Sequence, residues 1–243
     1  MTAGADAASK DYWDRAWANY RAQLYPGPIF EFHELYRRFL SRDERMSCVE
    51  IGAMPGNHLV YFHREFGYRV TAIDYCSDVS PIARTMELNG ITDYSLVNAD
   101  VFAMPAGTQY DVVFSSGFAE HFEDYRGAVA VHAGLLRKGG YLLITVPNTR
   151  YLHKFLMMSF CPEVYAVHRD YLMDRKVLRS VAEALGLEVL HCDYLRTFRT
   201  FYPVPGAAAL ALRAVDRFLR LLRLDRLPNA FASPYLHLVA RKP

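Results

Sequence analysis

Along most of the chain, short apolar runs alternate with stretches in which apolar residues recur every three or four positions. The first pattern is typical of buried strands and the second of amphipathic helices. It predicts strands at residues 48–51, 69–74, 94–98, 111–115, 141–146, 188–194 and 235–240, and helices at 57–66, 81–88, 125–136, 173–185 and 207–224. Strands that alternate with helices predict a mostly parallel sheet with helices on both faces. We therefore expect an α/β fold, a three-layer sandwich around a seven-stranded sheet.

The region before the first strand is aromatic and helical. In residues 11–21, Trp13, Trp17 and Tyr20 share one helical face. A second helix is predicted at residues 29–40, after a Pro-Gly-Pro break. These rings either close over a ligand or simply pack the first helix against the domain.

Length and composition fit one large domain. The chain has 243 residues, of which 52% are hydrophobic, and this is enough to cover a sizeable core. We interpret residues 1–42 as an N-terminal helical lid segment and residues 43–243 as the main domain. Within that domain, residues 149–172 are rich in Tyr, Phe, Met and His without a clear period, which indicates an acceptor-binding insertion.

Charge and cysteine usage exclude several classes of protein. The formal net charge is only +2, so no long-range field favours nucleic acid as a partner. The four cysteines show no metal-ligand spacing and are too few for a disulfide scaffold, which indicates reduced thiols and a cytoplasmic location. The chain shows no signal peptide at its start and no apolar run long enough to span a membrane. Its oligomeric state is not predicted.

A glycine loop between the first predicted strand and helix indicates a nucleotide-type cofactor. The loop runs from Glu50 to Gly56, and its glycines let the backbone approach a ligand. Asp74 ends the next strand, where a carboxylate accepts hydrogen bonds from ribose hydroxyls, although it could instead cap a helix. A dinucleotide fingerprint needs glycines where this chain has Met54 and Asn57, so a nicotinamide-dependent oxidoreductase is the less favoured alternative.

The stretch from Val49 to Asn148 resembles class I SAM-dependent methyltransferases in five motifs that occur in the right order. The motifs are Glu50-Ile51-Gly52-Ala53-Met54-Pro55-Gly56, Asp74, Asn98-Ala99-Asp100-Val101, the strand 111–116, and the turn and strand 136–147. The resemblance implies a Rossmann-like fold with an antiparallel last strand. It also implies S-adenosyl-L-methionine (SAM) as methyl donor and S-adenosyl-L-homocysteine as product. Met54 departs from the family, which usually has a glycine there.

The resemblance also implies which residues contact the donor. They are Tyr12, Trp17, Glu50, Gly52, Ala53, Met54, Gly56, Asp74, Tyr75, Asp100, Val101, Ser115, Ser116 and Gly117. In this family, the acidic residue after the second strand binds the ribose, and the one after the third strand contacts the adenine amino group. We therefore expect these two roles for Asp74 and Asp100.

The segment after the fourth strand is expected beside the reactive methyl group. His121 is the best candidate for a general base, because the ordinary pKa of histidine lies near neutrality. Glu120 would orient it or bind the acceptor, although both side chains could merely brace the loop. The pair could also bind a metal together with His153 or His168. Gly117 stands where a second carboxylate is needed, so no metal is expected.

The predicted acceptor is a small molecule, in specialised-metabolite or glycan tailoring. Its candidate contacts are Tyr20, Phe118, Tyr151, His153, Tyr165 and His168. Aromatic residues and methionines are also ordinary core residues, so each of these side chains has a purely structural alternative. A non-catalytic partner subunit with the same fold is a further alternative. A nucleic-acid methyltransferase is disfavoured, because the fourth strand lacks the Asn/Asp-Pro-Pro-aromatic signature.

Residues 207–226 form a basic amphipathic segment. Arg213, Arg217 and Arg220 share one helical face. Such a helix either covers the domain with its arginines in solvent or lies on an anionic membrane. We favour the covering helix.

Overall fold

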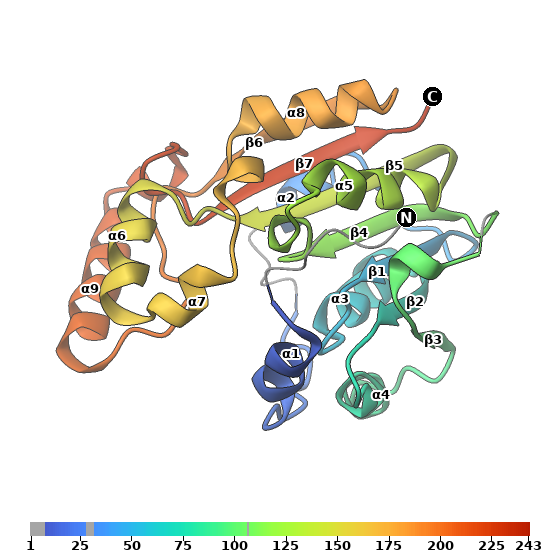
Figure 1. Ribbon diagram of the computed structural model, residues 1–243, viewed down its shortest axis with the longest axis horizontal. Coiled ribbons are helices and arrows are strands. Elements are labelled where there is room, and N and C mark those ends of the chain that lie inside the picture. The colour runs from blue at the N-terminus through green and yellow to red at the C-terminus, as the bar shows by residue number, and fades with distance from the viewer. Residues whose placement is uncertain (1–7, 28–31, 106) are drawn as a thin grey trace.

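The computed structural model describes residues 8–27, 32–105 and 107–243 (Figure 1). The strands are β1 (Ser47–Ile51), β2 (Arg69–Asp74), β3 (Tyr94–Asn98), β4 (Tyr110–Ser116), β5 (Leu136–Pro147), β6 (Glu188–Leu195) and β7 (Tyr235–Arg241). They form one sheet in the order β3-β2-β1-β4-β5-β7-β6. β1 to β5 pair in parallel, whereas β7 runs antiparallel to both β5 and β6. The predicted seven-stranded, mostly parallel sheet with an antiparallel last strand is confirmed.

The helices alternate with the strands as the hydrophobic pattern predicts. The α-helices are α1 (Lys10–Trp17), α2 (His33–Tyr36), α3 (Asn57–Phe66), α4 (Ser80–Leu88), α5 (Tyr125–Gly134), α6 (Tyr151–Phe160), α7 (Pro162–Ala166), α8 (Arg175–Ala184) and α9 (Gly206–Leu221). Four 3₁₀ turns join them: η1 (Val101–Ala103), η2 (Ala119–His121), η3 (Asp170–Met173) and η4 (Leu224–Arg226).

Alternating side chains of each strand build two separate cores. On one face of the sheet, Val49, Val113 and Ile144 pack with α5 and α8. On the other face, Cys48 and Phe114 pack with α2, α3 and α4. Because successive strand residues point to opposite faces, near-continuous apolar strands produce the three-layer arrangement.

Some predicted boundaries differ from the structure. The first helix ends at Trp17 and not near residue 21, and residues 33–36 are the helical part of the predicted helix 29–40, of which residues 29–31 lie outside the described residues. The predicted helix 125–136 ends at Gly134, where β5 follows two residues later.

The segment without a clear period, residues 149–172, is largely helical. It forms α6, α7 and the start of η3. Its helices are short, and α6 also exposes apolar residues, which hides a single apolar period.

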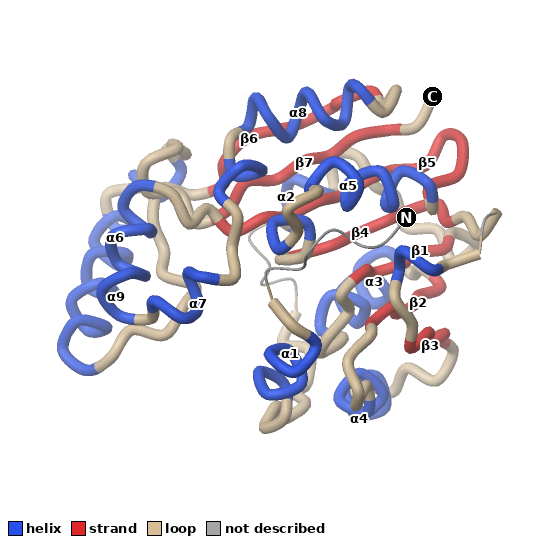
Figure 2. Tube along the Cα trace, in the orientation of Figure 1, coloured by secondary structure: helices blue, strands red, loops and turns tan. Residues whose placement is uncertain are grey.

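Helices α6, α7 and α9 gather at one end of the molecule, beyond the carboxyl end of β5 (Figure 2). They enclose a third small core of Leu156, Met157, Cys161, Phe198 and Tyr202. None of the helices in the described ranges has both the length and the hydrophobicity needed to span a bilayer.

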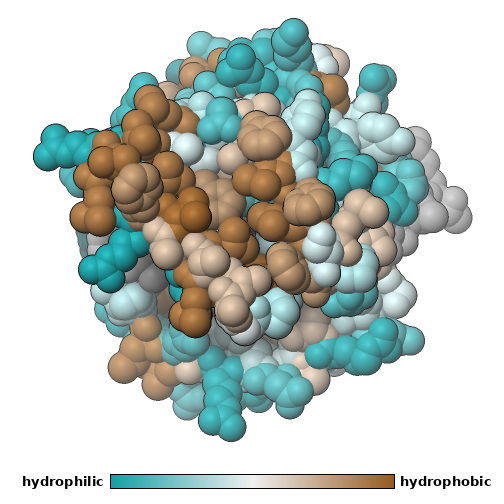
Figure 3. All heavy atoms as spheres, turned by 90° about the vertical axis from the view of Figure 1, so that its left-hand side faces the viewer, coloured by the Kyte–Doolittle hydropathy of each residue, from teal (hydrophilic) through white to brown (hydrophobic). Residues whose placement is uncertain are grey.

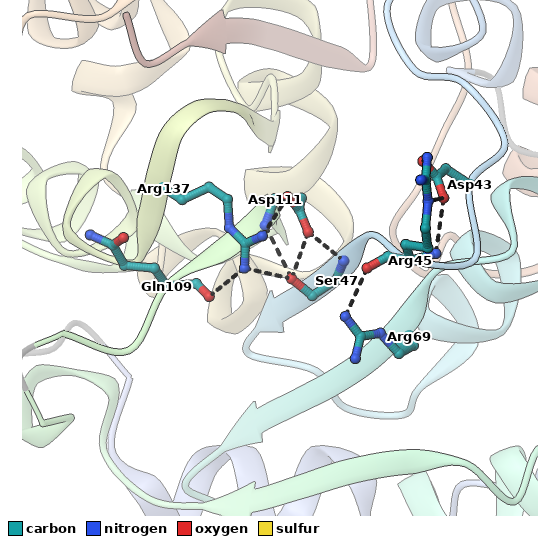
Figure 4. A network of polar contacts seen from close by, with 7 residues as sticks. All are labelled: Asp43, Arg45, Ser47, Arg69, Gln109, Asp111 and Arg137. Atoms are coloured by element: carbon teal, nitrogen blue, oxygen red, sulfur yellow. Dashed lines mark hydrogen bonds and ion pairs between the residues drawn. The ribbon is translucent and has the colours of Figure 1, made fainter.

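A polar network holds the amino ends of neighbouring strands together (Figure 4). The candidate functional site lies at the opposite, carboxyl ends of the strands. Asp111 Oδ2 accepts hydrogen bonds from the backbone N–H and the hydroxyl of Ser47, at 2.7 and 2.9 Å. Its other oxygen accepts one from Arg137 Nη1 at 2.8 Å. Asp111 thereby joins β1, β4 and β5, and Arg69 Nη2 ties β2 in by donating to the carbonyl of Arg45.

Candidate functional site

A cavity of about 310 Å³ opens at the carboxyl ends of β1, β2 and β4. It lies where the chain crosses from one side of β1 to the other, because β2 and β4 flank that strand. Ligands of open α/β sheets bind at such switch points. Its lining comprises Ala8, Ser9, Lys10, Trp13, Trp17, Ile51, Gly52, Met54, Ile73, Asp74, Tyr75, Cys76, Ala99, Asp100, Val101, Phe102, Ser116, Gly117, Phe118, His121 and Phe122.

Asp74 fixes two of the loops that form the cavity. Its Oδ2 accepts a hydrogen bond from the Met54 backbone N–H at 3.0 Å, and its Oδ1 accepts one from the Cys76 backbone N–H at 2.9 Å. Each carboxylate oxygen can accept a second hydrogen bond. Asp74 can therefore hold the loops in place and still accept hydrogen bonds from a ribose.

Gly52 is required by both its backbone angle and its surroundings. Its φ is +68°, and a Cβ at this position would lie 3.0 Å from Cδ2 of Phe118. Met54, which replaces the usual glycine of the family, is nearly buried and its side chain forms part of the cavity wall. The substitution therefore narrows the cavity without displacing the loop, whose backbone Asp74 holds.

Asp100 lines the cavity beside apolar residues. It begins η1, where its Oδ1 accepts a hydrogen bond from the Phe102 backbone N–H at 3.0 Å. The neighbouring lining from Val101, Phe102 and Phe122 is apolar. A carboxylate at the rim of an apolar slot suits a flat aromatic base with an exocyclic amino group.

The N-terminal helix lies against the cavity. Trp13 and Trp17 of α1 line it, and Asp14 anchors the helix to the β2–α4 loop by accepting a hydrogen bond from the Ser77 backbone N–H at 2.8 Å. Just after α1, the Tyr20 hydroxyl donates to Asn57 Oδ1 at 3.0 Å. Two hydrogen bonds thus hold the predicted lid segment beside the cavity.

Tyr12 does not line the cavity, and its ring packs edge-on against Trp13 with centroids 5.1 Å apart. Burial, followed by the negative charge of Glu163, raises the pKa of its phenol. Trp13 takes the position beside the cavity, and its ring meets the ring of His121 edge-on at 4.8 Å.

A cluster of Glu120, His121 and His168 adjoins the cavity at η2. Their ligand atoms all lie within 4.8 Å of one another, and His121 Nε2 is 3.7 Å from Glu120 Oε1. His121 Nδ1 bonds to the Val167 carbonyl at 2.6 Å, and His168 Nδ1 bonds to the Val164 carbonyl at 2.7 Å. Since a carbonyl only accepts, both Nδ1 atoms carry the proton, and both Nε2 atoms have a free lone pair.

Burial sets the charge of this cluster. It raises the pKa of Glu120 to about 8, and neither carboxyl oxygen has a hydrogen-bond partner among the described residues. Burial, with His168 nearby, lowers the pKa of His121 to about 3. At neutral pH the pair therefore consists of a protonated Glu120 and a neutral His121. The cluster could hold a proton or a divalent cation.

Besides Tyr12, four of the expected donor contacts do not line the cavity. Glu50 is buried, and its Oε1 hydrogen-bonds to His58 Nδ1 at 2.8 Å. Ala53 is buried in the glycine loop, and Gly56 is the residue just before α3, with a φ of +97°. Ser115 hydrogen-bonds to His132 at 2.8 Å. These residues shape the loops, whereas Gly52, Met54, Asp74, Tyr75, Asp100, Val101, Ser116, Gly117 and Trp17 line the cavity itself.

The expected acceptor contacts do not converge. Phe118 lines the donor cavity, and His168 lies beside His121 with ring centroids 4.8 Å apart. Both nitrogens of buried His153 are engaged, with the Tyr202 hydroxyl at 3.0 Å and the Ala232 carbonyl at 2.9 Å. His153 is thus a brace within the third core.

Two further candidates are tied up by polar neighbours. The Tyr165 hydroxyl donates to Asp170 at 3.0 Å. Tyr151 is half exposed, and Arg150 donates to its hydroxyl at 2.8 Å. Neither residue lines the cavity.

Several lining residues carry no sequence signal of their own. Ser9, Lys10, Cys76, Phe102 and Phe122 line the cavity but belong to no motif. Trp13 could have been found, because it shares a helical face with Trp17. The others reach the cavity only because the fold brings their loops together.

Comparison with known proteins assigns the family. The chain belongs to the methyltransferase domain family, whose model matches residues 18–192, more than half of its length. It is a SAM-dependent methyltransferase by family, and its methyl donor is SAM. No curated protein matches the sequence.

Solved structures share the fold at low sequence identity. The geranyl diphosphate C-methyltransferase of Streptomyces coelicolor A3(2), solved with Mg²⁺, geranyl diphosphate and S-adenosyl-L-homocysteine, has a TM-score of 0.62 at 16% identity, covering 98% of this chain and 100% of that chain. A SAM-dependent methyltransferase of Mesorhizobium loti has a TM-score of 0.60 at 15% identity, covering 88% and 99%. The [4+2]-cyclase SpnF has a TM-score of 0.60 at 14% identity, covering 100% and 99%. Such likeness establishes the fold alone.

Proposed function

We propose that this protein transfers a methyl group from SAM to a small-molecule acceptor whose proton is taken up by His121 and Glu120. The observation that carries the proposal is the position of His121. It lines the donor cavity on one side and lies 3.7 Å from the buried carboxyl of Glu120 on the other. A donor cavity that ends at a proton-accepting pair suits an acceptor with an O–H or N–H group.

The cavity residues fit the donor. Asp74 and Asp100 would bind the ribose and the adenine, and the apolar side chains between them would enclose the base. Gly52, Ser116 and Gly117 would border the methionine portion, while Trp13 and Trp17 would exclude water. When bound, SAM supplies a methyl group activated by a positively charged sulfur, so the protein mainly aligns the acceptor and receives its proton.

The raised pKa of Glu120 makes it a stronger base than an ordinary carboxylate once it is ionised. A carboxyl group with a pKa of about 8 holds its proton at pH 7 and releases it above pH 8. His121, with a pKa of about 3, holds a transferred proton only briefly. We propose that, once Glu120 is ionised, His121 Nε2 takes the acceptor proton and passes it to Glu120 Oε1, 3.7 Å away, while Nδ1 keeps its own proton on the Val167 carbonyl.

The small size of the acceptor is supported by the surroundings of the site. Helix α1 lies against the cavity, and residues 167 and 168, just after α7, contact His121. These elements crowd the His121 end of the donor cavity, which favours a small acceptor over a polymer. The net charge of the whole chain is only +2, so the protein has no strong overall field that would favour a nucleic acid as acceptor.

A divalent cation is a second use that the same cluster offers. His168 supplies the third ligand that Gly117 cannot provide, and the backbone carbonyls fix both imidazoles with their Nε2 lone pairs free. A metal-assisted methyl transfer would then slow down when a chelator removes the cation, and its rate would recover when Mn²⁺ or Mg²⁺ is added. The proton-accepting pair predicts a rate that chelation does not change.

Donor binding is tested first, by calorimetry with SAM and S-adenosyl-L-homocysteine. We expect Asp74→Ala to weaken both ligands by at least about 100-fold, because it removes the ribose contact and releases two loops. Asp78→Ala, which changes an exposed carboxylate of the same loop, is the matched control and should bind like the wild type. Absence of binding to the wild type at millimolar donor would exclude the proposal.

Acceptor transfer is tested with SAM labelled at its methyl group. Candidate phenols, amines, carboxylates and sugars are screened, and each product is analysed by mass. A wild type that binds SAM tightly but labels none of them would favour the non-catalytic partner subunit. A His121→Ala variant that keeps full turnover would remove His121 from the proton path.

A further inference from the structure

Helix α9 packs only loosely onto the rest of the protein. It is the longest described helix, with 16 residues, and none of them is fully buried. In contrast, α3, α5, α6 and α8 each bury at least three residues. Only one narrow stripe of α9, with Leu212 and Leu219, packs on the third core.

The exposed side of α9 is apolar. Leu210, Phe218 and Leu221 are 64, 59 and 74% exposed, and Leu222 is 52% exposed. At 100° per residue these side chains fall on a continuous arc that faces away from the packed stripe. Apolar residues on both sides of one surface helix are not explained by packing within the chain.

The neighbouring helix α6 extends this apolar surface. Phe155 and Met158 are 69 and 56% exposed, whereas Leu156 and Met157 of the same helix pack inward. Figure 3 shows the hydrophobic side chains gathered over this end of the molecule, with hydrophilic residues around them. We call this surface the α6–α9 face and define it by Phe155, Met158, Leu210, Phe218, Leu221 and Leu222.

Arginines border the α6–α9 face on one side. Arg213 and Arg217 lie next to the exposed arc, and within the described residues neither has an ion pair or a side-chain hydrogen bond. Residues 206–226 contain five arginines and two aspartates, an excess of three positive charges, while the whole chain has a net charge of only +2. The excess positive charge of the chain is therefore concentrated in this segment, with Arg213 and Arg217 at the border of the face.

We propose that the α6–α9 face docks on an anionic phospholipid bilayer, with α9 lying parallel to the membrane plane. Phe and Leu side chains would enter the boundary between headgroups and acyl chains, and Arg213 and Arg217 would contact lipid phosphates. Charge complementarity selects this occupant: a second copy of the chain would bring the same unpaired arginines against each other. The proposal goes beyond methyl transfer and does not depend on the acceptor.

The test is co-sedimentation of the full chain with sucrose-loaded vesicles. Vesicles of phosphatidylcholine with about 30 mol% phosphatidylglycerol should bind the protein, and pure phosphatidylcholine vesicles should bind it far more weakly. Arg213→Gln with Arg217→Gln should lower the partition coefficient about 25-fold, since each arginine near an anionic surface contributes about fivefold. Phe218→Asp with Leu221→Asp should abolish binding. Raising NaCl to about 0.5 M should weaken it.

The control is Leu88→Gln, which replaces a leucine on α4 that is 46% exposed and lies off the face. It should bind vesicles like the wild type. All variants change exposed side chains, so their melting temperatures should match. The arginine variants keep the test valid if the Asp variants misfold.

Three results would overturn the proposal. The first is a wild type that stays in the supernatant with anionic vesicles. The second is equal binding to neutral and anionic vesicles. The third is a stable dimer in light scattering that Phe218→Asp converts to a monomer, which would assign the face to a second copy.

Discussion

The helical cluster of α6, α7 and α9 is built in the opposite way to the donor edge, by which we mean the carboxyl ends of β1, β2 and β4 around the cavity. At the donor edge, residues at the ends of adjacent strands act together, because Asp74 holds the amides of Met54 and Cys76 and also borders the cavity. In the helical cluster, the partners are far apart in sequence, since His153 contacts Tyr202 and the carbonyl of Ala232. Motifs at strand ends can therefore reveal the first region, whereas only the fold reveals the second.

The largest effect is expected where the two regions meet, at Glu120. We expect Glu120→Gln to lower turnover about 100-fold above pH 8, because glutamine cannot accept the acceptor proton. The wild-type rate should rise with pH and level off above about 8, as the carboxyl of Glu120 ionises. Rates from pH 6 to 10 measure both. Glu123→Gln, at a half-exposed carboxylate nearby, is the control.

Stability gives an independent readout of the same group. Because folding raises the pKa of Glu120, its burial is favourable at low pH, and that contribution is lost as pH rises from about 4.5 to about 8. In the Glu120→Gln variant, this contribution to the fall in the free energy of unfolding over that pH range should be absent. An unchanged pH dependence in both rate and stability would refute the assignment.

The next effect isolates the helical cluster. Burial lowers the pKa of His153 to about 4, so below pH 6.5 the unfolded chain binds a proton that the folded chain does not. As the pH falls from 7.5 to 5, His153 should lower the free energy of unfolding by about 2 kcal/mol. His153→Phe should be less stable at pH 7.5 but should show a shallower slope. Urea titrations at a series of pH values measure the slope.

A glycine substitution tests the donor edge alone. Gly52→Ala places a Cβ 3.0 Å from the Phe118 ring on a backbone with φ of +68°, so we expect SAM affinity to fall about tenfold. Gly134→Ala ends α5 with no heavy atom within 4 Å of the new Cβ, and it should leave binding unchanged. Equal affinity in the two variants would show that the loop is not held against Phe118.

The smallest effect concerns the lid. Tyr20→Phe removes the hydrogen bond from the Tyr20 hydroxyl to Asn57, and we expect SAM affinity to fall about threefold through faster dissociation. Stopped-flow fluorescence of Trp13 and Trp17, which line the cavity, would report the rate. A larger loss than for Gly52→Ala would mean that the lid, and not the glycine loop, dominates donor binding.

The sheet and the donor edge could be predicted from sequence because both depend on local rules. Apolar strands separated by helices specify the sheet, and Gly52 and Asp74 lie at strand ends by pattern alone. The short length of α2 and the helices of residues 149–172 could not be predicted, since tertiary contacts decide them. The sequence also did not indicate which histidine joins Glu120 and His121. His153 and His168 were equal candidates, and only the fold brings His168 to His121.

Side-chain roles were harder to predict than positions. Of the neighbouring residues Tyr12 and Trp13, Trp13 lines the cavity and Tyr12 does not, a difference of one residue that helical spacing alone does not resolve. The hydrophobic pattern also did not predict that the apolar arc of α9 is exposed, because the same residues are typical of an ordinary buried face. Exposure, not periodicity, separates these two cases.

The place of β7 in the sheet has a consequence for how the protein is made. β7 is synthesised after both β5 and β6, yet it lies between them and hydrogen-bonds to both. On the ribosome, β6 therefore waits without a partner in the sheet until residues 235–241 have emerged. The edges of β5 and β6 stay open during that interval, and unpaired strand edges of this kind favour aggregation.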